Sequence, residues 1–264
     1  KKVNYALRED MTKEEFVNEV IDGLLPPPQY FPENVRLNKN GYEDIDQVME
    51  KGKIPLSPSK FEYIAMQSGA VILDVRSADE FSKGHIPNSI FIGIDGGFAP
   101  WVGTLIGDTK HPIILVTPEG REEETITRLS RVGFDNTLGY LEGGITAWTG
   151  AGKDIEQIEN ITATQLQTKI EKGAAILDVR KESEYDSVHI PNATLIPLDK
   201  INESLNHYDF EKEFYLHCAG GYRSMIALSI LKKRGIHGGF NVAGGMRAIS
   251  YTHLRAHETF ANLV

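Results

Sequence analysis

The sequence predicts an α/β protein made of two tandem copies of one domain, each with a mainly parallel sheet and helices on both faces. The first observation is an internal repeat: residues 70–95 align without a gap with residues 174–199, and 13 of the 26 positions are identical. The second is that short strand-like apolar runs alternate with helical segments in each copy. Such alternation is typical of a parallel sheet covered on both faces.

The repeat divides the chain into three parts. We expect the first copy to span residues 54–152 and the second to span residues 153–264, with residues 1–53 preceding both. The segment after about residue 248 departs from the pattern of the first copy. In sheets of this kind, active sites lie beyond the carboxyl ends of the strands. The loops that follow the strands are therefore the places to search for functional residues.

Each copy contains the same expected elements in the same order. A buried strand is followed by a short helix that contains Glu80 or Glu184, and then by a turn at His-Ile-Pro-Asn. A second strand leads to a third, strongly apolar strand at Ile113–Val116 or Phe214–His217. A helix and a Gly-Gly turn close each copy.

The N-terminal residues predict one helix and a connector. Thr12 and Glu15 have the spacing of a capping box, and apolar residues recur at helical spacing up to about Leu24. From Pro26 to Pro58 the chain is rich in Pro, Asn and Gly and lacks periodicity. This part predicts an extended connector.

Composition excludes several function classes. A net charge of −9 gives no support to nucleic-acid binding. No apolar run approaches the roughly 18 residues that a membrane span needs, and Lys1 to Asn4 lack the apolar core of a signal peptide. The single cysteine, Cys218, excludes an intramolecular disulfide. We therefore expect a cytoplasmic protein with no nucleic-acid or membrane partner.

Cys218 is the strongest candidate for a reactive group. It follows the apolar run Phe214–Leu216 and precedes a helical segment, so the thiol lies at a helix N-terminus, where the dipole and unpaired N–H groups favour a thiolate. Gly220 and Gly221 let the backbone curl so that amides point at one centre. A cysteine that is only a small buried apolar residue would leave these glycines unexplained. The candidate site has Cys218 and Arg223 as catalytic residues and Ala219, Gly220, Gly221, Tyr222 and Ser224 as binding residues.

The segment from Cys218 to Ser224 fits the pattern Cys-x-x-Gly-x-Arg-Ser/Thr. It resembles the active-site loop of rhodaneses, sulfurtransferases whose cysteine carries a sulfane sulfur as a persulfide. Phosphatases that share their fold have a loop one residue longer, which fits a phosphate. The resemblance implies two tandem rhodanese-like domains, a covalent Cys218 persulfide and no other cofactor. It also implies that Arg223 binds the anionic end of a substrate.

The first copy is interpreted as catalytically silent. Two alignments are open: one places Val116 opposite Cys218, and the other places Thr117 there. Neither side chain can hold a persulfide. Glu119 and Glu122–Glu124 place carboxylates at the expected helix N-terminus, where they would satisfy the amides and repel an anion.

Four polar residues of the second copy recur in the first and are interpreted as structural support. They are Asp178, Arg180, Glu184 and His189, which match Asp74, Arg76, Glu80 and His85. We expect a buried arginine–carboxylate pair that holds the turn, with a ligand contact from Asp178 or Arg180 as the alternative. His217 is expected to be a core histidine, because successive strand side chains point to opposite faces.

Residues 12–41 contain Leu-Leu-Pro-Pro-Pro-Gln-Tyr-Phe-Pro-Glu-Asn-Val and resemble the closing helix of metallo-β-lactamase-fold persulfide dioxygenases. Such enzymes occur fused to tandem rhodanese domains in bacteria. The resemblance implies that this chain is the C-terminal part of a fusion protein, with the dioxygenase domain as its partner. The iron ligands of the family lie in that domain. Because Lys1 to Met246 contain no matching cluster of His and Asp, we expect no metal here.

The resemblance implies a sulfurtransferase. It would move sulfur from thiosulfate or a glutathione- or coenzyme A-type persulfide to a thiol, sulfite or cyanide, in sulfide and persulfide detoxification. A non-enzymatic interaction or persulfide-sensing module is the alternative, and a phosphatase or arsenate reductase is third, disfavoured by loop length. The physiological donor and acceptor stay open, as does assembly into a homo-oligomer.

Overall fold

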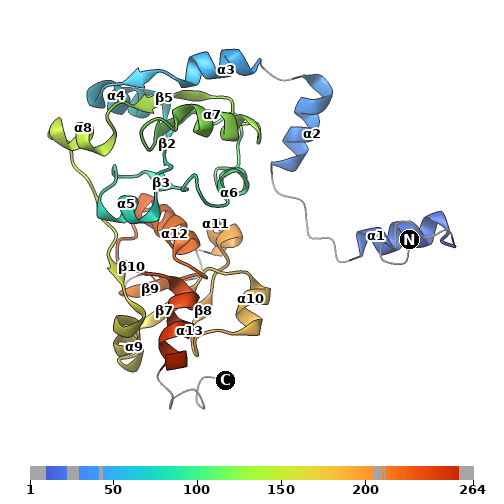
Figure 1. Cartoon of the computed structure of the whole chain (residues 1–264), viewed down its shortest axis with the longest axis vertical. Helices are drawn as coiled ribbons and strands as arrows, with labels where there is room; N and C mark the ends of the chain where they lie inside the picture. Colours follow the sequence, from blue (N-terminus) through green and yellow to red (C-terminus); the bar gives the residue numbers. More distant parts are fainter. Residues whose placement is uncertain are drawn as a thin grey trace.

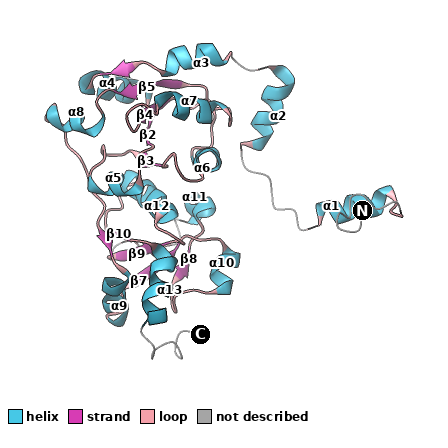
Figure 2. Ribbon diagram, viewed as in Figure 1, coloured by secondary structure: helices cyan, strands magenta, loops and turns pink. Residues whose placement is uncertain are grey.

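The computed structural model describes residues 10–22, 30–41, 44–204, 208, 210 and 212–255, with the backbone alone for residues 252–255. It contains two five-stranded sheets, one in each copy of the repeat (Figure 1). All hydrogen-bonded neighbours in both sheets are parallel. Helices flank both sheets (Figure 2). The predicted α/β class with two similar domains is confirmed.

The two sheets have the same strand order. In space, the first sheet runs β1 (Pro55–Leu56), β5 (Thr137–Leu141), β4 (Ile113–Val116), β2 (Val71–Asp74) and β3 (Ile90–Phe91). The second runs β6 (Asn160–Ile161), β10 (Gly239–Val242), β9 (Phe214–His217), β7 (Ala175–Asp178) and β8 (Thr194–Leu195). The strongly apolar strands β4 and β9 are central, as parallel strands buried on both faces should be.

The helices fall into three groups. Preceding the first sheet are α1 (Lys13–Ile21), α2 (Phe31–Asn40) and α3 (Ile45–Gly52). The first domain has α4 (Pro58–Ser68), α5 (Ala78–Lys83), α6 (Phe98–Leu105), α7 (Glu122–Ser130) and α8 (Gly144–Gly150). The second has α9 (Ala163–Glu171), α10 (Glu182–Ser187), the 3₁₀ turn η2 (Leu198–Lys200), α11 (Ile201–Ser204), α12 (Tyr222–Lys233) and α13 (Gly245–Arg255). Of the helices described here, none is both long and apolar enough to cross a membrane.

The central strands divide their side chains between the two faces of each sheet. In β4, Ile114 packs with Phe61 of α4 and Trp148 of α8. Its neighbour Ile113 belongs to a separate cluster with residues of α3, α6 and α7. In β9, Tyr215 packs with residues of α9 and α13, whereas Phe214 and Leu216 share a cluster with α12. Both sheets are therefore covered on two faces.

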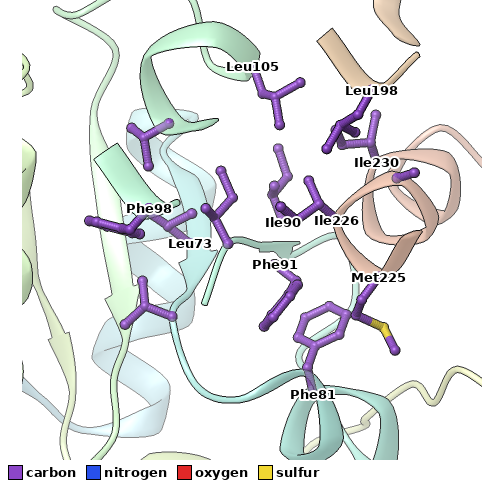
Figure 3. Close-up of a cluster of buried hydrophobic side chains, with 14 of the residues drawn as sticks. Leu73, Phe81, Ile90, Phe91, Phe98, Leu105, Leu198, Met225, Ile226 and Ile230 are labelled. Atoms are coloured by element: carbon purple, nitrogen blue, oxygen red, sulfur yellow. The ribbon is translucent and has the colours of Figure 1, made fainter. Parts of the chain in front are cut away.

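Helix α12 is buried along most of its length, from Ser224 to Leu231. It lies between its own sheet and the first domain. Met225 and Ile226 lie beside Phe81 and Phe91 of the first domain, in one apolar cluster that crosses the domain boundary (Figure 3). A helix that is apolar all round needs cover on every side. The two domains consequently share a core.

Polar contacts fix the same interface. The edge strand β3 has its Phe91 amide hydrogen-bonded to the Ser229 hydroxyl of α12 at 3.0 Å. Lys232, near the end of α12, forms a 3.0 Å ion pair with Glu156 in the segment that joins the domains. Because edge-strand amides have no strand partner on the open side, the Ser229 contact satisfies a group that would otherwise lack an acceptor.

The N-terminal prediction was right for one helix and wrong for the connector. The capping box of Thr12 and Glu15 is confirmed at the start of α1, while Leu24 lies outside the described residues. The expected connector from Pro26 to Pro58 instead contains α2, α3 and β1 in its described part. Proline stands in the first turn of α2, where a missing N–H costs nothing. An Asp44 side-chain cap begins α3, which buries Val48 against the first domain.

We predict that Phe91→Ala weakens both domains together. Phe91 is fully buried and lies 5.8 Å, between ring centroids, from Tyr222 of the second domain. Removing a buried phenyl ring costs about 3–5 kcal/mol. Urea unfolding should show a loss of this size in a single transition. Met66→Ala, at a 75% exposed residue, is the control and should cost less than about 0.5 kcal/mol. A loss below about 1 kcal/mol for Phe91→Ala would contradict the shared core.

Candidate functional site

Cys218 is the first residue after β9, at the carboxyl edge of the second sheet. Its side chain is 1% exposed. The chain then turns at Gly221, which has a φ of 95° and is the N-cap of α12. A side chain at such a φ would be strained, so glycine allows the tight entry into the helix. The predicted order of strand, loop and helix is confirmed.

The Cys218 sulfur faces hydrogen-bond donors. The Gly221 amide donates to Sγ at 3.1 Å, and the Ser224 hydroxyl lies 3.6 Å from it. The helix has no side-chain cap, and within the described residues the amides of Tyr222, Arg223 and Ser224 have no backbone acceptor. First-turn amides carry the positive end of the helix dipole. The loop can therefore stabilise negative charge on a sulfur atom.

The beginning of α13 holds the loop from the other side. The amides of Met246 and Arg247 donate to the carbonyls of Cys218 and Ala219 at 2.7 and 3.1 Å. A Cβ on Gly245 would lie 2.3 Å from the Cys218 carbonyl oxygen, and Gly245 has a φ of 52°. Only glycine fits there, which explains the predicted Gly-Gly turn. The loop is thus fixed by backbone contacts to α13.

A chain of buried polar groups leads away from Cys218. The Ser224 hydroxyl donates to Oδ1 of Asn241 at 2.7 Å, and Nδ2 of Asn241 donates to Asn160 at 2.7 Å. Asn160 donates in turn to the Ser82 hydroxyl of the first domain at 2.9 Å. Because Ser224 has one hydroxyl proton, Asn241 decides where that proton points. Sequence reasoning missed Asn241, although a polar residue next to Val242 in a short strand was the available signal.

Arg223 is paired with Glu184. Its two terminal nitrogens donate to the two carboxylate oxygens at 2.6 and 2.8 Å. This hydrogen-bonded pair lowers the pKa of Glu184 to about 2 and raises the pKa of Arg223. Glu184 also accepts from the Lys181 amide at the start of α10. The arginine therefore ties the start of α12 to α10, and part of its charge is neutralised before any substrate binds.

The remaining predicted support residues lie behind the loop. Arg180 forms a buried pair with Asp178, at 2.6 Å for Nη2, and donates to the Val188 carbonyl at 2.7 Å. The His189 ring stacks on Tyr185 with centroids 3.9 Å apart. The first domain has the same contacts at Asp74, Arg76, Gly84, His85 and Phe81. This repetition indicates a role in holding the turn.

His217 is buried beside Asp178, with Nε2 3.6 Å from its carboxylate. Burial lowers the pKa of His217. Neither ring nitrogen has a hydrogen-bond partner in the described structure. Its place in the core agrees with the expected role. Among the described residues, no group of three or more His, Cys, Asp and Glu side chains could hold a metal.

Tyr222 points into the first domain. Its hydroxyl donates to the Gly93 carbonyl at 2.8 Å, and its ring contacts Phe91 edge-on. Burial raises the pKa of this hydroxyl. The Tyr222 side chain therefore anchors the loop, and its backbone amide is the group that lies at the start of α12.

A family model for the rhodanese-like domain matches residues 57–151 and residues 162–252. The chain belongs to the rhodanese-like family. The two matched segments contain every strand of the two parallel sheets except the edge strands β1 and β6, and both loops that follow the central strands. Sequence and family comparison thus agree on a tandem pair of rhodanese-like domains.

Relatives match parts of the chain. The protein YrkF of Bacillus subtilis is 32% identical over 99 residues, 37% of this chain and 54% of YrkF. A tRNA sulfurtransferase of Thermoplasma acidophilum is 31% identical over 129 residues, 48% of this chain and 24% of that protein. The chain thus spans about half of the first relative and a quarter of the second. A solved rhodanese-like domain protein from Staphylococcus aureus is 38% identical, covering 35% of this chain and 91% of that chain at a TM-score of 0.33.

The register of the sheets identifies the counterpart of Cys218 in the first rhodanese-like domain. Asp74 pairs with Val116, and Asp178 pairs with His217. The residue that follows the central strand is therefore Thr117 in the first domain and Cys218 in the second. Thr117, and not Val116, is the counterpart of Cys218. The Glu122 carboxylate lies 3.2 Å from the Thr117 hydroxyl and 3.1 Å from the Gly120 amide. The Glu122 carboxylate thus accepts the hydrogen bonds that this loop could otherwise donate to an anion.

We predict that Thr117→Cys, in a Cys218→Ser background, forms no persulfide, because Glu122 remains on the loop. Replacing residues 117–123 by the sequence of residues 218–224 should allow some persulfide to form in the same background. Intact mass after thiosulfate treatment measures both. If the single cysteine accepted sulfur as readily as the transplanted loop, the carboxylate would not be the feature that silences the first domain.

We predict that the Arg223–Glu184 pair contributes stability only while Glu184 is ionised. Its folded-state pKa of about 2 lies below the ordinary value of 4.5, so the contribution is complete above about pH 4.5 and is lost as pH falls through 2. Glu184→Gln keeps the helix cap and should lower the free energy of unfolding by about 1 kcal/mol or less at pH 6. Urea unfolding between pH 6 and 2.5 should show this difference shrink.

The matched control is Glu80→Gln. Glu80 caps α5 with Ser77 in the first domain, and the described contacts give it no arginine partner. Its effect should be smaller than that of Glu184→Gln. Equal effects of the two variants at every pH would show that capping alone explains Glu184.

Proposed function

We propose that the protein is a sulfurtransferase that uses a Cys218 persulfide. The observation that carries this proposal is the position of Sγ, 3.1 Å from the Gly221 amide at a helix start whose first amides have no side-chain cap. Membership of the rhodanese-like family, which includes relatives named as sulfurtransferases, supports it. A loop of this kind stabilises a sulfur anion in the way an oxyanion hole stabilises an oxyanion.

The reaction has two steps. The Cys218 thiolate attacks the outer sulfur of thiosulfate, the S–S bond of the donor breaks, and sulfite leaves with its electron pair. The resulting Cys218–S–S⁻ is then attacked at its outer sulfur by an acceptor thiolate, sulfite or cyanide, and the Cys218 thiolate is released. A glutathione- or coenzyme A-type persulfide can replace thiosulfate and would leave as a thiolate. Because the donor departs before the acceptor binds, we expect ping-pong kinetics.

The loop residues have separate roles in this scheme. The amides from Ala219 to Ser224 hold the sulfur anion, while the Ser224 hydroxyl, 3.6 Å from Sγ, is oriented by Asn241. Arg223 supplies fixed positive charge beside the loop, although Glu184 already binds its terminal nitrogens. The buried Asp178–Arg180 pair supports the turn behind the site.

The physiological context that we propose is sulfide and persulfide detoxification in the cytoplasm. An upstream metallo-β-lactamase-fold dioxygenase domain would oxidise persulfide to sulfite, which the second domain could then combine with sulfur from another persulfide to make thiosulfate. The support for this part is the resemblance of residues 12–41. We propose no metal and no cofactor for the chain itself.

A binding or persulfide-sensing module is the second candidate. One observation favours it, namely that the loop of the first domain has Thr117 in the place of Cys218 and holds the Glu122 carboxylate at the Thr117 hydroxyl and the Gly120 amide. Such a module would either stay unmodified after donor treatment or keep its persulfide when an acceptor is added. Turnover with excess acceptor separates the two candidates.

We predict that Cys218→Ser reduces sulfite release from thiosulfate plus cyanide to below about 1% of wild type, because a serine hydroxyl cannot form a persulfide. The fold should be unchanged, since the two side chains are nearly the same size. Circular dichroism and urea unfolding check this. Activity of more than a few per cent would rule out Cys218 as the nucleophile.

Arg223 provides the graded comparison for the same assay. Arg223→Ala should be less damaging than Cys218→Ser, and Arg223→Lys should restore only part of the loss, because an ammonium cannot bind Glu184 with a planar pair of donors. Full activity in Arg223→Ala would remove Arg223 from the site.

A further inference from the structure

A cavity of about 490 Å³ opens directly beside the Cys218 loop. It is lined by Arg180, Ala219, Met246, Arg247, Ser250 and Tyr251. Ala219 belongs to the loop, so a molecule in this cavity lies next to the residues that hold the sulfur. Its walls come from the loop, the first turns of α13 and the buried pair behind the turn. A cavity with two arginines favours an anionic occupant.

The two arginines differ in their partners. Arg180 is buried and already pairs with Asp178 and the Val188 carbonyl. Arg247 is exposed, and among the described residues no carboxylate pairs with its guanidinium. Its charge is therefore the one in this cavity that a ligand can neutralise.

The guanidinium of Arg247 lies over the loop. A Cβ built on Gly220 would be 3.4 Å from Cζ of Arg247 and 3.5 Å from Nη2. The Arg247 amide is fixed at 3.1 Å from the Ala219 carbonyl, which holds the first turn of α13 at this distance. A residue without a side chain at position 220 leaves the guanidinium and the loop in direct contact. Any donor that reaches Cys218 over Gly220 must pass Arg247.

The fold does not require an arginine at this position. The corresponding Gly-Gly turn of the first domain continues with Thr146 where the second has Arg247. A cation in the first turn of a helix opposes the helix dipole. Here it also lies near the positive end of α12. The placement is electrostatically unfavourable for the empty loop, and a bound anion would offset it.

We propose that Arg247 is the residue that selects anionic sulfur donors, by binding their oxyanion end while the outer sulfur lies at Cys218. The donor class is a sulfonate, as in thiosulfate, or a persulfide with a carboxylate tail. A guanidinium binds both with a planar pair of N–H groups. This inference rests on the proposed sulfurtransferase function and adds to it the residue that selects the donor by its charge. Both terminal nitrogens of Arg223 are hydrogen-bonded to Glu184, so the guanidinium of Arg247 is the group that binds the donor.

The test measures the second-order rate of sulfur loading on Cys218 by rapid quench and intact mass. The donors are thiosulfate, glutathione persulfide and the persulfide of 2-mercaptoethanol, whose tail is uncharged. Arg247→Ala should slow loading from the two anionic donors by about 10- to 100-fold, the range expected for losing a charged hydrogen bond. In a titration of donor concentration the loss should appear as a higher concentration for half-maximal loading, and loading from the uncharged donor should fall far less. Arg247→Lys should recover part of the rate.

Lys172→Ala is the matched control for net charge. Lys172 is exposed at the end of α9, before β7, and so lies at the opposite edge of the sheet from Cys218. It should leave all three rates within about twofold. Equal losses with charged and uncharged donors in Arg247→Ala would overturn the proposal, because they would indicate a structural role. Unchanged rates with both anionic donors would overturn it as well.

A binding measurement separates this proposal from the proposed function. Thiosulfate is titrated calorimetrically into Cys218→Ser protein with and without Arg247→Ala. Binding that is lost with Arg247→Ala supports the anion site even if wild type transfers sulfur from no donor, a result that would reject the sulfurtransferase function alone. Binding that is equal in the two proteins would overturn the role of Arg247, whatever the transfer assay shows.

Discussion

Helix α12 is packed on one side by its own sheet and on the other by the first domain, and this burial fixes the groups around Cys218. The first turn of α12 supplies the free amides and Ser224, so the axis of the helix sets where they point. The hydrogen bond from the Tyr222 hydroxyl to the Gly93 carbonyl also fixes the end of the loop against the first domain. Hydrogen bonds weaken steeply when distance or angle departs from the optimum. The packing of the first domain therefore helps to determine the geometry of the site in the second.

Features that depend on contiguous residues could be predicted from the sequence. The repeat gave two sheets of the same order, and the apolar runs placed β4 and β9 at their observed bounds. The turn predicted in both copies has Asn88 and Asn192 at φ of 65° and 63°, a conformation that asparagine tolerates better than most residues. The same local cues failed for α2 and α3, because proline and asparagine are common both in loops and at helix starts.

Contacts between distant residues could not be predicted in this way. Glu184 recurs as Glu80, which suggested a purely structural residue, and both do cap a short helix. Glu184 also binds Arg223, 39 positions away, and nothing in the local pattern indicates that second contact. Asn241 and Arg247 were missed for the same reason. Each becomes relevant only when β10 and α13 are brought against the loop by folding.

The two loops show how charge decides what one fold can bind. In the first domain the Glu122 carboxylate accepts a hydrogen bond from the Gly120 amide of the loop. The positive end of the helix dipole is therefore neutralised by a residue of the protein itself. In the second domain no carboxylate occupies the corresponding place in the described structure, and Glu184 neutralises Arg223 on the α10 side instead. The guanidinium of Arg247 lines a cavity beside the Cys218 loop, and no carboxylate of the described residues pairs with it. Under our proposal, an anionic donor gains affinity from the exposed charge of Arg247, whereas in the first domain Glu122 already lies at the donors of the loop.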